Sequence, residues 1–220
     1  MASISAGRVL AGLGLLALPL CAPAADLGAT IAKQGNGEGA TACATCHGAD
    51  GSGQGAAGFP RLAGLPQAYL AKQLRSFGDG SRANATMKPI ANALSAKEIK
   101  AVAAYYGGME PPAKAPGAAG ASAERKAAGE AIAKRGLWAK DVPACTKCHG
   151  PDGRGVGDNF PPLAGQHASY IRNQIDAWQS DKRSNDPNQL MSGVAQRLSS
   201  DEAAAVAAYF ASLPAEPTDQ

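Results

Sequence analysis

The segment Cys43–His47 reads CATCH and Cys145–His149 reads CTKCH, so the pattern C-x-x-C-H occurs twice in the chain. This pattern is typical of covalent haem attachment. The two thiols add to the haem vinyl groups as thioethers, and the histidine after the second cysteine binds the iron from one side. The two motifs therefore predict two covalently bound haem c groups.

Other uses of these cysteines have to be weighed against haem. A lone C-x-x-C pair also occurs in zinc sites and thioredoxin-like redox pairs, and four thiols can form disulfides in an oxidising compartment. None of these uses explains a histidine at the same place in both copies, where two of the three histidines of the chain lie. We therefore predict thioethers at four cysteines and iron binding by two histidines: Cys43, Cys46, Cys145 and Cys148, with His47 and His149.

The N-terminus has the pattern of a secretory signal peptide. Arg8 precedes an apolar run over 9–20, and small residues over 22–25 offer a cleavage site. The run is too short to span a membrane, and no later stretch is long and apolar enough. A lipoprotein anchor at Cys21 is the alternative, which the bulky Leu20 disfavours. We predict a signal peptide over 1–25 and a periplasmic protein without a transmembrane anchor; peripheral membrane association stays open.

The two motifs belong to two copies of a longer unit. Ile31–Gly35 matches Ile132–Gly136, and Phe59–Gly64 matches Phe160–Gly165, each pair 101 residues apart. Between the copies the chain is rich in Pro, Ala and Gly, which is typical of a linker. Such a repeat indicates a duplicated domain. The predicted organisation is a first domain over 26–109, a linker over 110–121 and a second domain over 122–220.

Both halves are predicted to be all-α, because neither shows strand-like alternation. Ser95 with Glu98, and Ser199 with Glu202, form S-x-x-E capping boxes that begin the last helix of each half. A domain of under about 100 residues has little room for an apolar core, so a buried haem is expected to supply much of it. Helical patterns cover six segments: 27–34, 67–77, 95–106, 122–135, 167–179 and 199–213.

Two methionines are candidates for the second axial ligand of each iron. Met87 and Met191 occupy equivalent polar segments, interpreted as loops before the last helix, 40 and 42 residues after the motif histidines. Packing is the commonest role of methionine, but its repetition at equivalent positions favours iron ligation. Met109 fails this test because its equivalent is Leu213, so we expect it to pack. We expect His167 to be a surface or capping residue.

A histidine and a methionine on each iron would set the chemistry of the site. Thioether sulfur favours ferrous over ferric iron, and burial in an apolar pocket acts in the same direction, so both raise the reduction potential. The iron would also have six ligands. Since oxygen or peroxide could bind only by displacing one of them, the predicted activity is electron transfer.

With these residues identified, the chain resembles the dihaem class I cytochromes c, and specifically the cytochrome c4 family. Members have a P-x-L-x-G segment on the histidine side of the haem, matched by Pro60–Gly64 and Pro161–Gly165. The resemblance implies two tandem class I cytochrome c domains related by a pseudo-twofold axis. It also implies that the carbonyls of Pro60 and Pro161 accept the Nδ1 hydrogens of the motif histidines and fix their rings.

The resemblance further implies that the first and last helices of each domain cross, with Gly28 against Tyr105 and Gly129 against Tyr209. The copies differ at Arg61, whose equivalent is a proline. This arginine is a candidate for neutralising a haem propionate between the domains, and the alternative is a solvated loop residue. Such differences predict unequal potentials for the two haems.

Charge gives little information about partners. The formal net charge of +3, without basic runs or interleaved aromatic residues, does not indicate nucleic acid binding. The resemblance implies a periplasmic carrier between a membrane-bound, quinol-oxidising respiratory complex and a terminal oxidase or reductase. The alternatives are a dihaem cytochrome subunit of a periplasmic oxidoreductase and a dihaem peroxidase. Because a peroxidase needs an iron site that can open, the matched methionines argue against it, and we predict a carrier that is not itself an enzyme.

Overall fold

The computed structural model describes Met1 and residues 24–112 and 120–216. These residues form α-helices and short 3-10 helices, with no β-strand among them beyond isolated bridges. The all-α prediction is therefore confirmed. The predicted signal peptide up to residue 23 and residues 113–119 of the predicted linker lie outside the described residues.

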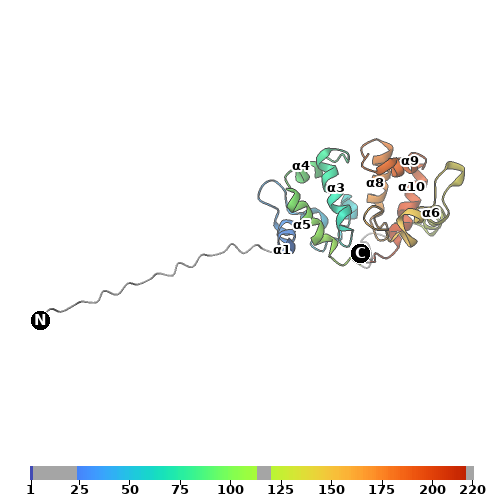
Figure 1. The fold of residues 1–220 in the computed structure, drawn as a ribbon. Helices are drawn as coiled ribbons and strands as arrows, with labels where there is room; N and C mark the ends of the chain where they lie inside the picture. The colour runs from blue at the N-terminus through green and yellow to red at the C-terminus, as the bar shows by residue number, and fades with distance from the viewer. Residues whose placement is uncertain (2–23, 113–119, 217–220) are drawn as a thin grey trace.

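The described helices form two similar groups (Figure 1). The first half contains α1 (Ala24–Gln34), α2 (Ala44–His47), α3 (Gln67–Asp79), α4 (Met87–Asn92) and α5 (Ala96–Gly107). The second half contains α6 (Ala123–Arg135), α7 (Thr146–His149), α8 (Ala168–Gln179), α9 (Leu190–Ala195) and α10 (Ser200–Ser212). The sequence predicts the six longer helices and misses the four short ones, α2, α4, α7 and α9.

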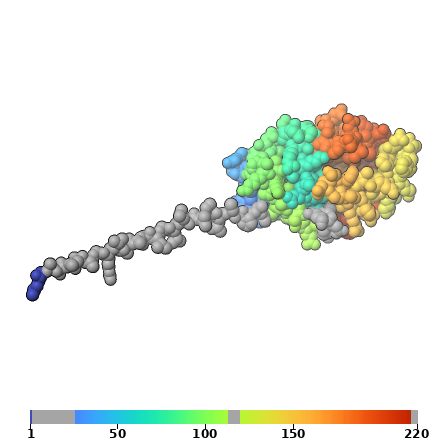
Figure 2. All heavy atoms as spheres, in the orientation of Figure 1, coloured from blue at the N-terminus to red at the C-terminus, as the bar shows by residue number. Residues whose placement is uncertain are grey.

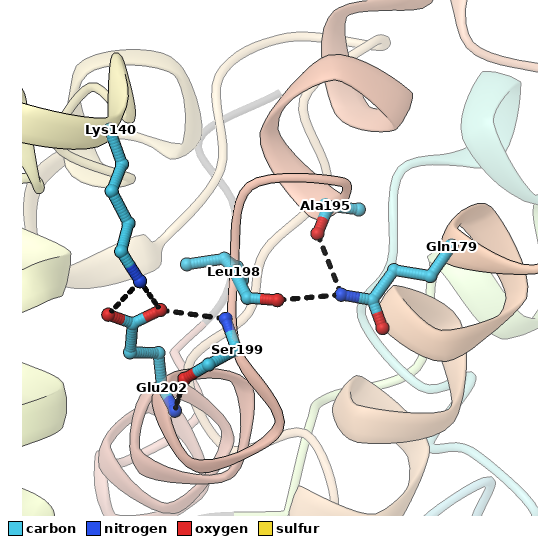
Figure 3. Close-up of polar contacts among 6 residues, drawn as sticks. All are labelled: Lys140, Gln179, Ala195, Leu198, Ser199 and Glu202. Carbon is cyan, nitrogen blue, oxygen red and sulfur yellow. Dashed lines mark hydrogen bonds and ion pairs between the residues drawn. The ribbon is translucent and has the colours of Figure 1, made fainter.

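The last helix of each half begins with the capping box that the sequence predicts. At α10 the Ser199 amide donates to the Glu202 carboxylate at 2.7 Å, and the Glu202 amide donates to the Ser199 hydroxyl at 3.2 Å (Figure 3). Ser95 and Glu98 form the same reciprocal pair at α5. Lys140 adds an ion pair to Glu202 at 2.7 Å, which connects the loop after α6 to the start of α10.

The first and last helices of each half cross at a glycine. A Cβ atom at Gly28 would lie 2.9 Å from the Cβ of Tyr105, and one at Gly129 would lie 2.9 Å from the Cβ of Tyr209. At Gly129 the same atom would also lie only 2.0 Å from the backbone oxygen of Ala205. The predicted glycine and tyrosine contacts are therefore confirmed, and α6 can approach α10 this closely only without a side chain.

Replacing Gly129 with Ala should therefore destabilise the second half. Alanine improves helix propensity by about 1 kcal/mol, but the clash is with backbone, which cannot rotate away. We expect a net loss of about 1–3 kcal/mol in the free energy of unfolding, as for other overpacked contacts. Gly120→Ala is the matched control, because a Cβ there meets no atom within 4 Å. Equal denaturation midpoints for the two variants would contradict the crossing.

Each half has its own apolar core. The helices of the first half surround Ile31, Leu70, Val102 and Tyr106. Those of the second half surround Ile132, Ile171, Val206 and Phe210. The two halves nevertheless pack directly against each other in the space-filling view (Figure 2). The two apolar cores are thus separate, and the halves touch through their surfaces.

The halves meet through the loops that follow α3 and α8. The Ala83 amide donates to the Lys182 carbonyl at 2.7 Å, and the Ser184 amide donates to the Ser81 carbonyl at 2.7 Å. Ser81 and Lys182 are equivalent positions, as are Ala83 and Ser184, so the second bond repeats the first with the halves exchanged. This reciprocity is the pseudo-twofold relation that the family resemblance implies. In Figure 1, α3 and α8 face each other across the boundary.

Candidate haem sites

Each half contains one cavity, and the residues of its motif line that cavity. We call them haem cavity 1, of about 470 Å³, and haem cavity 2, of about 420 Å³. Most of the remaining lining is apolar, for example Leu70, Phe77 and Val102 in cavity 1 and Ile171, Trp178 and Val206 in cavity 2. The predicted site residues divide between the cavities as Cys43, Cys46, His47, Pro60 and Met87 in cavity 1 and Cys145, Cys148, His149, Pro161 and Met191 in cavity 2.

The two motif histidines have the same environment. The Nδ1 atom of His47 lies 2.9 Å from the carbonyl oxygen of Pro60, and that of His149 lies 2.8 Å from the carbonyl oxygen of Pro161. Because a carbonyl can only accept, Nδ1 must carry the hydrogen in each ring. Burial lowers the pKa of both histidines, which favours the neutral ring, although the hydrogen bond opposes this shift. A neutral ring with Nδ1–H keeps the Nε2 lone pair available to a metal.

Among the described residues, none of the four motif cysteines forms a disulfide. Cys43, Cys46 and Cys145 are partly buried, and Cys148 is exposed. Burial raises the pKa of Cys43, and it raises the pKa of Cys145 to about 11. In each motif the first cysteine precedes a four-residue helix, the second cysteine is the third residue of that helix, and the motif histidine ends it. One turn of helix thus presents both thiols and the imidazole to the same cavity.

The two candidate methionines lie on short helices and not in the loops that the sequence suggests. Met87 begins α4 and Met191 is the second residue of α9, each helix having six residues. Asn84 supports the start of α4, because its Oδ1 accepts the Met87 amide at 2.8 Å. In the second half Asp186 accepts the Ser192 amide at 2.8 Å. A polar side chain can thus begin a helix within a segment whose composition reads as a loop.

The end of α9 is also fixed, as Figure 3 shows. The side-chain amide of Gln179, from α8, donates to the carbonyls of Ala195 and Leu198, each at 2.8 Å. One bond reaches the last residue of α9 and the other reaches the turn that follows it, so both hold the C-terminal end of α9 to α8. Met191 is therefore held on a helix whose two ends are both anchored.

Asp186 makes the two sites electrostatically different, because it is a carboxylate on the wall of haem cavity 2. It accepts hydrogen bonds from the Trp178 indole at 3.1 Å and from the Ser192 hydroxyl at 2.9 Å. Burial alone would raise the pKa of Asp186, but the hydrogen bonds from Ser192 and Trp178 outweigh it and lower the pKa. The group is therefore a fixed negative charge near neutral pH.

Asp186→Asn should raise the reduction potential of the second haem. A negative charge stabilises ferric over ferrous iron, and asparagine removes the charge while keeping an oxygen acceptor. We expect a shift on the order of tens of millivolts, from the Coulomb energy of one charge in a partly screened site. Asp201→Asn, at an exposed position in the first turn of α10, is the control. An equal shift in both variants, measured by potentiometric titration, would show that the effect is not local.

Sequence analysis misses a group of residues between the two cavities. Tyr69, Gln73 and Arg82 lie in the first half, and their equivalents Tyr170, Gln174 and Arg183 lie in the second. The tyrosines and glutamines line both haem cavities, whereas Arg82 lines cavity 1 and Arg183 lines cavity 2. Each pair is identical in type and 101 residues apart, which is the signal that could have found them.

Two expectations about single residues need correction. Arg61 is only 1% exposed, so the solvated alternative is wrong. It also lines neither cavity; its guanidinium donates to the carbonyl of Ala63 and, across the boundary, to that of Ala164 at 3.1 Å. His167 stands at the N-cap position of α8, but its side chain makes no capping hydrogen bond and it is not a surface residue. It is only 3% exposed, and its Nε2 lies 2.9 Å from the carbonyl oxygen of Ser52 in the other half. The packing of the two halves buries both residues, and a single-domain pattern does not report that packing.

Comparison with known proteins identifies the family. A sequence model described as Cytochrome c matches residues 26–110 and again residues 127–214. The chain belongs to the cytochrome c family. Since each matched segment contains one attachment motif and one cavity, this cytochrome carries two covalently bound haem c groups.

Individual relatives narrow the comparison. The cytochrome is 48% identical over 96% of its length to the thiosulfate dehydrogenase electron acceptor of Stutzerimonas stutzeri, covering 97% of that protein. Among solved structures it resembles reduced cytochrome c4 from Pseudomonas stutzeri, with a TM-score of 0.74, 31% identity and coverage of 86% and 98% of the two chains. It also resembles a thiosulfate dehydrogenase from Marichromatium purpuratum, with a TM-score of 0.80 and 47% identity over 86% of this chain. This cytochrome spans 40% of that longer chain.

These findings establish the general function of the cytochrome. It is a cytochrome c4-like, dihaem electron-transfer protein. Within residues 24–112 and 120–216, none of its helices is long and apolar enough to cross a membrane.

Proposed function

We propose that each haem iron of this cytochrome is held between one motif histidine and one methionine. The pairs are His47 with Met87 and His149 with Met191, and the thioethers form on Cys43, Cys46, Cys145 and Cys148. Each pair lines the same cavity, which supports this assignment. The bonds from Nδ1 to the carbonyls of Pro60 and Pro161 also support it, because they leave Nε2 available and fix the plane of each ring.

With this ligand set the cytochrome is not itself catalytic. A bound haem supplies an iron that changes between ferric and ferrous states. A histidine and a methionine of the chain would hold each iron, so oxygen or peroxide could bind only by displacing one of them. The apolar walls of the cavities exclude water and favour the less charged ferrous centre. Each chain can therefore take up two electrons and release them without chemistry at a substrate.

The proposed electron donor is a periplasmic thiosulfate dehydrogenase. The main support is the match to a thiosulfate dehydrogenase electron acceptor over nearly the full length of both proteins. The structural match to part of a longer thiosulfate dehydrogenase chain agrees with a partner of this kind. Electrons would then pass to a terminal oxidase or reductase. The signal-like N-terminus supports the periplasm as the compartment in which this exchange occurs.

Mixing experiments test the donor. The oxidised, haem-loaded cytochrome is mixed with the thiosulfate dehydrogenase of Stutzerimonas stutzeri and thiosulfate, and haem reduction is followed by visible absorption. Cytochrome c4 from Pseudomonas stutzeri serves as the comparison acceptor. We expect this cytochrome to be reduced at least tenfold faster than the comparison protein, and not at all when the dehydrogenase is omitted.

A second candidate donor is the membrane-bound, quinol-oxidising complex. It is favoured by the match to cytochrome c4, which covers 98% of that chain. Reduction by this complex together with no reduction by the dehydrogenase would replace the first proposal with the second. Either result leaves the assignment of the axial ligands untouched.

A further inference from the structure

Two buried arginines lie side by side where the halves meet. Arg82 and Arg183 are each only 6% exposed, and their backbones form an isolated β-bridge with each other. Arg82 stacks on Phe77 at 4.4 Å, and Arg183 stacks on Trp178 at 4.0 Å, measured from guanidinium carbon to ring centroid. Each stack is the pseudo-twofold copy of the other.

All the hydrogen-bond acceptors of these guanidiniums are neutral. Arg82 donates to Gln73 at 3.1 Å, to Gln174 at 2.6 Å and to the Tyr170 hydroxyl at 2.6 Å. Arg183 donates to Gln174 at 3.0 Å and to Gln73 at 3.1 Å, and also to Asn185 at 3.0 Å. Among the described residues, no Asp or Glu forms an ion pair with either arginine.

Two neighbouring cations buried without an anion are costly. Desolvation of a charge costs several kcal/mol unless a charged partner offsets it, and here the two charges also repel each other. Burial lowers the pKa of Arg183, and the charge of Arg82 lowers it further. Stacking on aromatic rings recovers only about 1–2 kcal/mol per pair. The residues of the chain therefore do not offset the cost of burying these two cations, and an anion bound beside them would stabilise the pair.

The cavities show where that charge can come from. Arg82 lines haem cavity 1 and Arg183 lines haem cavity 2, while Gln73 and Gln174 line both. Haem has two propionate carboxylates, which are its anionic groups, and arginine binds carboxylates well because of its planar fork of donors. The two cavities thus meet at a site whose charge is complementary to the propionates of both haems.

We propose that Arg82 and Arg183 together bind propionates of both haems and act as positioning residues that set both reduction potentials. The proposal rests on haem occupying the two cavities as described above. Arg82 donates to Gln174 of the other half, and Arg183 donates to Gln73 of the other half. Because each guanidinium is held between the halves, its charge acts on both irons. Arg61, the sequence-based candidate, does not line either cavity.

The test is the reduction potential of both haems in the full-length, haem-loaded Arg82→Gln variant. Removal of the positive charge leaves a propionate uncompensated, which favours ferric iron. We expect the reduction equilibrium of the first haem to fall about tenfold, or 59 mV, and that of the second at least threefold, about 28 mV. The two haems are followed separately by the NMR signals of their methyl groups. Arg183→Gln should give the mirror-image result.

Controls separate charge from structure. Arg75→Gln removes a charge from an exposed position on α3 and should move neither potential. Arg82→Lys keeps the charge and should keep both reduction potentials close to those of the wild-type protein. This variant tests the charge even if Arg82→Gln folds poorly. A shift confined to the first haem, or no shift at all, would overturn the proposal. If the wild-type protein lacks two haems or the ferric thioether absorption, the axial ligand assignment fails instead, which is a distinguishable result.

Discussion

A Cys145→Ala, Cys148→Ala double variant is expected to lose one haem and to unfold its second half. Both thioethers of that half are removed, so the haem is no longer attached, and haem cavity 2, of about 420 Å³, loses its contents. Water would then meet the apolar walls of this partly open cavity, and at about 25 cal/mol per Å² of apolar surface this exposure costs on the order of several kcal/mol. That cost is comparable with the whole stability of a small domain, about 5–15 kcal/mol. Collapse of the second half is therefore the expected outcome.

Mass spectrometry and circular dichroism check this result. The mass should fall by one haem, and the helical signal should fall by the contribution of α6 to α10. The matched control is the Cys43→Ala, Cys46→Ala variant, which should lose the other haem and leave the second half folded around its own. A double variant that still carries two haems would show that the motif cysteines are not the attachment points.

The second large effect is expected when the axial methionines are changed. Met87→His and Met191→His should each keep six ligands on the iron but lower the potential of that haem. Nitrogen is a harder donor than thioether sulfur and stabilises ferric iron, and axial ligands span roughly 0.8 V in haem proteins. We expect a decrease on the order of 0.1 V or more, measured by potentiometric titration, together with loss of the ferric thioether absorption of that haem.

Met109→Leu is the control for both variants. Met109 packs against the core of the first half and does not line haem cavity 1, so its loss should change neither potential nor the thioether absorption. If Met191→His keeps the thioether absorption of the second haem, another residue binds that iron. The same result would remove the reason for the six-coordinate, non-catalytic assignment.

The sequence predicts the two covalently bound haem c groups correctly, because all the residues of each attachment motif are neighbours in the chain. Five consecutive residues bring two thiols and an imidazole to one cavity through a single helical turn. The repeat identifies the two methionines as candidate ligands, but it does not predict the short helices on which they lie. Asn84 and Asp186 begin or hold those helices through side-chain hydrogen bonds, which composition and periodicity do not report.

The contact between the halves is the part that the sequence conceals. Arg82 and Arg183 look like surface arginines in either half alone, since each directly follows a polar residue, Ser81 or Lys182. They become buried only when the halves meet, which is a contact over 101 residues of sequence. Arg61 misleads for the opposite reason. It differs between the copies and attracts attention, yet it donates to backbone carbonyls and lines neither cavity.

The central claim is that one chain carries two haems, each held by a histidine and a methionine, and transfers electrons without an open iron site. The most direct measurement is a reductive titration of the full-length, haem-loaded protein under carbon monoxide, which counts electrons and reports ligand binding in the same visible spectra. We predict uptake of two electrons per chain, with low-spin spectra throughout and no carbon monoxide adduct. Uptake of one electron, or a ferrous haem that binds carbon monoxide at once, would contradict the claim.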